Sequence, residues 1–166
     1  TGSELTQPVG NAFSGNPNGD VSVVEFFDYN CGYCRASLPV IAALTKADPK
    51  VRIVYRELPI LAESSQAAAR ASLAAARQGR WPAFHDALYT GGQVTTATIA
   101  AAAAKAGVDL STAGSAQNDA EIARNLKLAG QLGVNGTPSW VIGDRVLSGA
   151  LPLEELQRAV AAARAH

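Results

Sequence analysis

The stretch FFDYNCGYCRASLPV, residues 26–40, contains both cysteines of this 166-residue chain, Cys31 and Cys34. The β-branched and aromatic run VSVVEFF at 21–27 leads into it and is typical of a strand that is buried on both faces. Apolar residues at helical spacing follow it and predict a helix over about 31–46. The two thiols are therefore expected where a strand passes into a helix.

The remainder of the chain predicts a mixed α/β organisation. VRIVYREL at 51–58 predicts a second strand, and its polar residues at alternate positions indicate one less buried face. SWVIG at 139–143 and RVLSGA at 145–150 predict a hairpin, and Pro152 begins a last helix. Residues 1–20 are rich in Gly, Asn, Pro and Ser, which predicts an irregular lead-in.

Between the second strand and the hairpin lies a long alanine-rich block. Clusters of turn-forming residues interrupt it and predict about four helices. Trp81 and His85 stand out in this block, and we interpret them as a packed start of one helix. The block as a whole is expected to be a scaffold inserted into the α/β unit.

Composition excludes some classes of partner. Fourteen basic residues balance fourteen acidic ones, and no dense run of Lys or Arg occurs, so we expect no binding to nucleic acid. No apolar run approaches the roughly 18 residues that span a bilayer. The chain has no methionine and TGSELTQ lacks the regions of a signal peptide, so we expect that an upstream segment has been removed.

Three interpretations of the C-x-x-C spacing compete. A zinc site needs about four ligands, and beyond the cysteines the chain offers only His85 and His166. A structural disulfide across so small a loop would restrain the unfolded chain little. A redox-active dithiol is favoured, because the start of a helix directs free N–H groups and positive dipole at the sulfur of Cys31. We therefore expect no metal and no cofactor, with Cys31 as the more exposed nucleophile and Cys34 as the buried resolving thiol.

With VVEFFDYNCGYC at 23–34, the helical block and GTPSWVIG at 136–143, the sequence resembles the DsbA-like thiol:disulfide oxidoreductases of the bacterial periplasm. The resemblance extends over nearly the whole chain. It implies an α/β thioredoxin fold with an inserted all-helical subdomain. The implied division is an N-terminal extension at 1–20, a thioredoxin-fold domain at 21–58 and 136–166, and an inserted helical subdomain at 59–135.

The resemblance also implies roles for residues outside the cysteines. Thr137 and Pro138 match a cis-proline loop beside the sulfurs, where an extended substrate could pair by its backbone. Glu25 matches a buried acid that accepts a proton near Cys34, and burial should raise its pKa. Gly32 and Tyr33 are the dipeptide that tunes the redox potential and faces the substrate.

The implied function is a periplasmic enzyme that exchanges disulfides with substrate proteins, as a disulfide isomerase or an oxidase. Gly32-Tyr33, with Thr before the proline, is similar to the DsbC-type isomerases and ScsC-like proteins. This dipeptide contains no histidine that could stabilise the reduced form as in DsbA. The implied partners are unfolded or misoxidised proteins and a membrane redox partner, either DsbB-like or DsbD/ScsB-like. We expect oligomers only through a missing N-terminal segment. Export would require a signal peptide, which is also absent from this sequence. Two alternatives remain open: a redox-inert peptide-binding or chaperone-like module, and sequestration of a metal such as copper by the dithiol.

Overall fold

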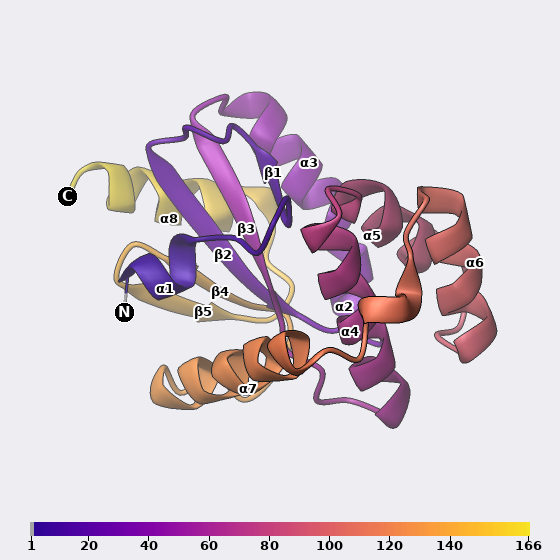
Figure 1. Ribbon diagram of the computed structural model, residues 1–166. Coiled ribbons are helices and arrows are strands. Elements are labelled where there is room, and N and C mark those ends of the chain that lie inside the picture. Colours follow the sequence, from indigo (N-terminus) through magenta and orange to yellow (C-terminus); the bar gives the residue numbers. More distant parts are fainter. Residues whose placement is uncertain (1) are drawn as a thin grey trace.

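A five-stranded mixed sheet forms the centre of the computed structural model, which describes residues 2–166 (Figure 1). The strand order is β1-β3-β2-β4-β5. β2 and β3 are parallel, and the other neighbouring pairs are antiparallel. The strands are β1 (Phe13–Gly15), β2 (Val21–Phe27), β3 (Val51–Glu57), β4 (Ser139–Ile142) and β5 (Arg145–Ser148). The predicted second strand and the predicted hairpin are confirmed.

Helices cover both faces of this sheet. The helices are α1 (Gly2–Thr6), α2 (Gly32–Ala36), α3 (Leu38–Ala47), α4 (Glu63–Arg77), α5 (Trp81–Thr90), α6 (Thr96–Ala106), α7 (Ala116–Gln131) and α8 (Leu153–Arg164), with a 3-10 turn at Leu110–Thr112. Val23 and Phe27 of β2 belong to the core cluster that includes residues of α3 and α8. Val24 and Phe26 belong to the cluster that includes residues of α1 and α7. Because successive side chains of a strand point to opposite faces, β2 is buried on both, as predicted.

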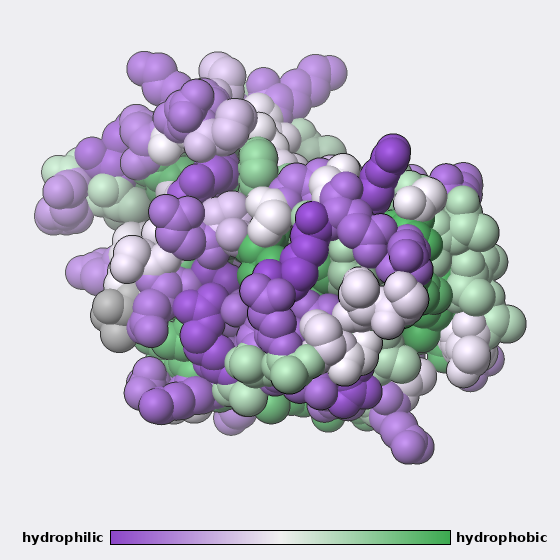
Figure 2. All heavy atoms as spheres, in the orientation of Figure 1, coloured by the Kyte–Doolittle hydropathy of each residue, from purple (hydrophilic) through white to green (hydrophobic). Residues whose placement is uncertain are grey.

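The helical block between β3 and β4 consists of α4 to α7. Figure 1 shows α4, α5 and α6 beside the sheet, with α7 passing beneath it. The surface at the right of Figure 2 is pale green, which marks mildly hydrophobic residues. Figure 1 places the alanine-rich helix α6 there. Trp81 and His85 are buried at the start of α5, and their rings stack with centroids 4.1 Å apart. The expected packing role of these two residues is confirmed, while the division at 59–135 stays a prediction.

The single helix predicted over about 31–46 is interrupted at Ser37, between α2 and α3. Pro39 explains the break, because it has no N–H to donate to the carbonyl four residues earlier. The chain nevertheless continues in nearly the same conformation. Ser37 keeps right-handed helical dihedral angles, and its carbonyl accepts the N–H of Ile41.

The prediction of an irregular lead-in over residues 1–20 was wrong in two places, because α1 and β1 are regular. Both elements are too short for periodicity to indicate, and tertiary contacts hold them. β1 pairs with β3. Gly10 lets the chain pass against α4 with a φ of 49°, where a Cβ would lie 1.9 Å from the carbonyl oxygen of Ala76.

The prediction of a less buried face on β3 was also wrong, because Arg56 is only 1% exposed. Its guanidinium donates to the carbonyls of Glu4, Leu5 and Gln7 at the end of α1. It also forms an ion pair with Glu121 of α7, with an N–O distance of 3.1 Å. α1 and α7 together therefore cover this face, and Arg56 supplies the hydrogen bonds that the end of α1 lacks.

We expect Arg56→Ala to destabilise the fold by about 3 kcal/mol or more, because it removes the buried partner of the Glu121 carboxylate and leaves only the partly exposed Arg124. Urea unfolding measures the effect. The control is Arg158→Ala, which breaks an exposed ion pair with Glu155 and should change stability little. Equal losses in the two variants would show that Arg56 is not the link between α1, β3 and α7.

Candidate active site

Cys31 and Cys34 lie at the turn from β2 into α2, and both are free thiols. Cys31 is the N-cap of α2, and its sulfur accepts the N–H of Cys34 at 3.1 Å. This places a helix-start N–H on the sulfur, as the spacing predicted, and favours the thiolate form. The thiol of Cys31 also lies 3.4 Å from the carbonyl oxygen of Thr137, to which it donates.

The sulfurs are more enclosed than the sequence indicated. Cys31 is 5% exposed and Cys34 is 1% exposed, so the predicted order holds although both residues are buried. The nearby carbonyl of Thr137 accounts for part of this cover. Tyr33, which is 68% exposed, is instead the outermost side chain of the motif, and Gly32 beside it is also exposed.

The Thr137–Pro138 peptide bond is cis, as the resemblance implied. The bond precedes β4, whose first residue Ser139 is the register partner of Phe26 near the end of β2. The loop therefore lies at the same end of the sheet as Cys31. The N–H of Gly149 donates to the carbonyl of Pro138 at 2.8 Å and ties the loop to the chain that follows β5.

Glu25 is 2% exposed in the middle of β2, so its expected burial is confirmed. Its Oε2 atom is buried without a hydrogen-bond partner among the residues that the structure describes. Burial penalises the charged form and raises the pKa of this carboxyl to about 8. A carboxyl in this condition can hold or release a proton close to neutral pH.

The charge of Glu25 also affects the thiol of Cys34. Burial raises the pKa of the Cys34 thiol, and the negative charge of Glu25 raises it further. Cys34 therefore stays protonated at neutral pH and needs a base before it can attack a disulfide.

Asp28 is a residue of this site that the sequence did not single out. It is 2% exposed, and its two carboxylate oxygens accept four hydrogen bonds. The backbone N–H groups of Ile60 and Leu61 donate to Oδ2, both at 2.9 Å. The N–H of Asn30 and the hydroxyl of Ser65 donate to Oδ1, at 2.9 and 2.7 Å. Asp28 thus joins the end of β2 to the loop after β3 and to the start of α4.

The backbone of Asp28 contacts the dithiol directly. Its carbonyl accepts the N–H of Cys31 at 3.0 Å and the hydroxyl of Tyr89 at 3.1 Å. Aspartate is common in the turn that follows a strand. The position of Asp28 in the sequence therefore did not indicate a role at this site. The available signal was its place directly after a strand that is buried on both faces.

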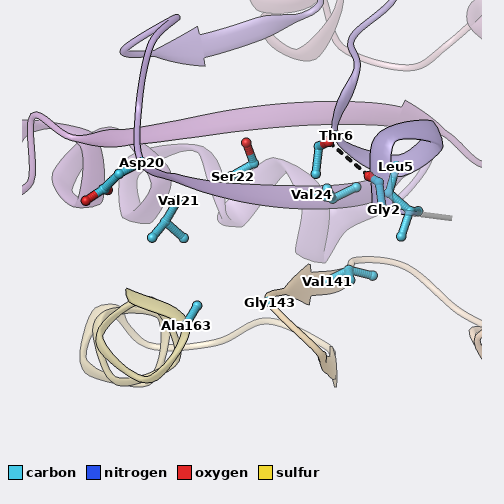
Figure 3. Close-up of a pocket in the computed structure, with 10 residues that line it drawn as sticks. All are labelled: Gly2, Leu5, Thr6, Asp20, Val21, Ser22, Val24, Val141, Gly143 and Ala163. Atoms are coloured by element: carbon cyan, nitrogen blue, oxygen red, sulfur yellow. Dashed lines mark hydrogen bonds between the residues drawn. The ribbon is translucent and has the colours of Figure 1, made fainter. Parts of the chain in front are cut away.

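The described residues show no alternative centre for metal chemistry. Residues 2–166 contain no group of three or more His, Cys, Asp or Glu side chains that could hold a metal ion. Over the same range, no helix is long and apolar enough to cross a bilayer. A cavity of about 290 Å³ does lie beside α1 (Figure 3), but Asp20 and Val21 line it at the beginning of β2, whereas Cys31 follows the end of that strand.

We expect Glu25→Gln to make stability less dependent on pH. The folded protein binds the Glu25 proton more tightly than the unfolded chain, because the pKa rises from 4.5 to about 8 on folding. This contribution is complete below the unfolded pKa and is lost as the pH rises through the folded one. Between about pH 5 and 8 the wild type should therefore lose up to about 4 kcal/mol relative to the variant.

Urea unfolding at a series of pH values measures this difference. Glu63→Gln, at an exposed position in the first turn of α4, is the control and should follow the wild type. Parallel curves for the wild type and Glu25→Gln would mean that Glu25 is ionised in the folded protein throughout this range.

Comparison with known proteins agrees with this geometry. A family model described as "DSBA-like thioredoxin domain" matches residues 22–161. A thioredoxin-like oxidoreductase from Silicibacter pomeroyi DSS-3 is 44% identical, with a TM-score of 0.93 over 100% of this chain and 99% of that one. A periplasmic thioredoxin-like protein from Salmonella enterica serovar Typhimurium is 31% identical, with a TM-score of 0.87 over 99% and 96%. The catalytic domain of Proteus mirabilis ScsC is 27% identical, with a TM-score of 0.88 over 99% and 95%. These matches confirm the predicted thioredoxin-like α/β fold.

Curated relatives of greater length also match. The Na(+)/H(+) antiporter NhaA 1 of Salinispora arenicola is 30% identical over 150 residues, which is 86% of this chain. The NhaA 3 protein of Salinispora tropica is 31% identical over the same length. The chain spans 23% of the length of each of these two proteins. Their transport activity is therefore a property of proteins more than four times as long as the matched segment.

Proposed function

The chain belongs to the DSBA-like thioredoxin domain family, and from this premise we propose that it is a periplasmic enzyme that exchanges disulfides with substrate proteins through Cys31 and Cys34. One observation carries the proposal: two free thiols lie one helical turn apart, and the sulfur of the first, Cys31, accepts the N–H of Cys34 at the start of α2. The second lies deeper, within the field of Glu25. The two thiols are thereby suited to different steps of one reaction.

In the reducing direction, the Cys31 thiolate attacks one sulfur of a substrate disulfide. A mixed disulfide forms and one substrate thiolate leaves. Cys34 then gives its proton to Glu25 in its ionised form, and the new thiolate attacks the Cys31 sulfur. The second substrate thiolate leaves, so the substrate gains two electrons and the enzyme ends with a Cys31–Cys34 disulfide. The same steps in reverse oxidise a substrate dithiol.

The substrate would bind at the loop that contains Thr137 and Pro138. The carbonyl of Thr137 lies 3.4 Å from the Cys31 sulfur, so a peptide lying along this loop would bring its own cysteine to the nucleophile. Backbone pairing at such a loop is tolerant of sequence, which suits an enzyme that acts on many proteins. Tyr33, exposed beside Gly32, would contact the same peptide.

The proposed setting is the bacterial periplasm. The similar Salmonella protein is described as periplasmic, and that compartment permits stable disulfides. The substrates would be unfolded or misoxidised proteins. A DsbB-like or a DsbD/ScsB-like membrane protein would restore the dithiol pair to its working redox state.

Matched substitutions of the two cysteines test the exchange reaction. Cys31→Ser should reduce insulin reduction and oxidative refolding to the uncatalysed rate, because no mixed disulfide can form. Cys34→Ser keeps the nucleophile and loses the resolving thiol, so mixed disulfides with substrates should accumulate on non-reducing gels. Full activity of Cys31→Ser, or no trapped species with Cys34→Ser, would contradict the proposal. Peptide binding unaffected by either change, with no activity in the wild type, would indicate a redox-inert module.

A glutathione titration of the dithiol tests the prediction that this site is less oxidising than DsbA. Among the described residues, the contacts to the Cys31 sulfur are a backbone N–H and a backbone carbonyl, with no charged donor. We therefore expect a potential more negative than the value of about −120 mV for DsbA. A measured potential at or above that value would contradict this and indicate a strong oxidase.

A further inference from the structure

Four buried polar side chains form a continuous hydrogen-bonded chain between β3 and the inserted helices. The Glu57 Oε2 atom lies 2.6 Å from the Ser72 hydroxyl, which lies 2.9 Å from the Tyr29 hydroxyl. The Tyr29 hydroxyl lies 2.8 Å from Nδ1 of His85. None of the four residues is more than 6% exposed. The disulfide exchange described above uses none of them.

The donors in this chain can be assigned, because one neighbour can only donate. Trp81 Nε1 donates to Ser72 at 2.8 Å, which occupies one of the two acceptor positions of that hydroxyl. When Glu57 is a carboxylate, Ser72 must donate to it and accept from Tyr29. The proton of Tyr29 is then used, so Tyr29 accepts from a protonated Nδ1 of His85. Nε2 of His85 is left without a proton, and within residues 2–166 it has no hydrogen-bond partner.

A protonated Glu57 reverses the three hydrogen bonds of the chain, while Trp81 still donates to Ser72. The carboxyl now donates to Ser72, and with Trp81 it fills both acceptor positions of the hydroxyl. Ser72 must then donate to Tyr29, and Tyr29 must donate to His85. Nδ1 of His85 becomes the acceptor, so the ring proton resides on Nε2. Both states use the same distances between heavy atoms.

We propose that Glu57, Ser72, Tyr29 and His85 form a buried proton wire in which the charge state of Glu57 selects the tautomer of His85. One proton from solvent is taken up at Nε2, the Nδ1 proton passes to Tyr29, the Tyr29 proton to Ser72, and the Ser72 proton to Glu57. The carboxylate is neutralised, the imidazole is neutral before and after, and no electrons are transferred.

The surroundings of both ends agree with this assignment. Burial raises the pKa of Glu57 well above its usual value, and the negative charges of Asp28 and Glu121 raise it further, while the Ser72 hydrogen bond opposes them. Burial lowers the pKa of His85 to about 3, so the imidazole stays neutral near pH 7. The side chains packed around the His85 ring are aromatic: Phe27, Tyr29, Tyr55, Trp81 and Tyr89.

The wire lies close to the residues that contact Cys31. Tyr29 is two residues from Cys31, and its ring centroid is 4.9 Å from that of Tyr89. The Tyr89 hydroxyl donates to the same Asp28 carbonyl that accepts the N–H of Cys31. A change in the charge of Glu57 therefore occurs close to the residues whose hydrogen bonds position Cys31. The proton wire itself does not depend on whether the dithiol exchanges disulfides.

Nitrogen NMR of histidine-labelled protein, recorded from about pH 5 to 9, tests the wire. The chain contains only His85 and the terminal His166, so His166→Gln assigns the signals. We expect the His85 proton to move from Nε2 to Nδ1 as the pH rises, with the same midpoint as the carbon signal of the Glu57 carboxyl. A single His85 tautomer across this range, or two separate midpoints, would overturn the proposal.

Removal of one hydroxyl tests whether these residues transfer a proton or only pack together. Tyr29→Phe keeps the ring and should leave His85 in one tautomer at every pH while Glu57 still titrates. Tyr55→Phe is the matched control, because the Tyr55 ring also packs on His85 but its hydroxyl bonds to Ser14 outside the wire. This control should retain the tautomer change. Ser72→Ala should act as Tyr29→Phe does, and a tautomer change that persists in both variants would overturn the wire.

Discussion

The hydrogen bonds of Asp28 hold together the parts of the molecule that meet at the end of β2. The carboxylate fixes the loop after β3 and the start of α4, while the backbone carbonyl receives the N–H of Cys31 and the hydroxyl of Tyr89. The position of the nucleophile thus depends on contacts with the neighbouring strand and with two helices of the inserted block. A buried carboxylate is retained here because every acceptor position that faces the protein is used.

Two Glu side chains and one Arg side chain are also buried in β2 and β3, and each is accommodated differently. Arg56 keeps its charge because α1 and α7 supply acceptors for its guanidinium. Glu57 accepts a hydrogen bond from the Ser72 hydroxyl and forms one end of the proton wire. Among the described residues, the Oε2 atom of Glu25 has no hydrogen-bond partner, and burial raises the pKa of this carboxyl to about 8. Near neutral pH the group can therefore change between its protonated and ionised forms.

Much of this arrangement could be predicted from local patterns. The β-branched run at 21–27 forms the central strand, and the alanine-rich block forms α4 to α7 between clusters of turn residues. The predictions that failed concern two short elements and one buried charged side chain. α1 and β1 carry too few residues for a periodic signal, and Arg56 has the sequence signature of an exposed position. Their conformations depend on partners elsewhere in the chain, which no local pattern contains.

The sequence by itself determined that two thiols stand one turn apart at the start of a helix, because spacing and propensity are local properties of the chain. It also indicated Glu25 and Thr137–Pro138, through resemblance to a family. Only the tertiary structure decided that the Thr137 carbonyl lies against the Cys31 sulfur across 106 residues. Likewise, only the fold brings Glu57, Ser72, Tyr29 and His85 into one chain of hydrogen bonds. Hydrogen bonds act over about 3 Å, so residues far apart in sequence can share a proton only after folding has brought them together.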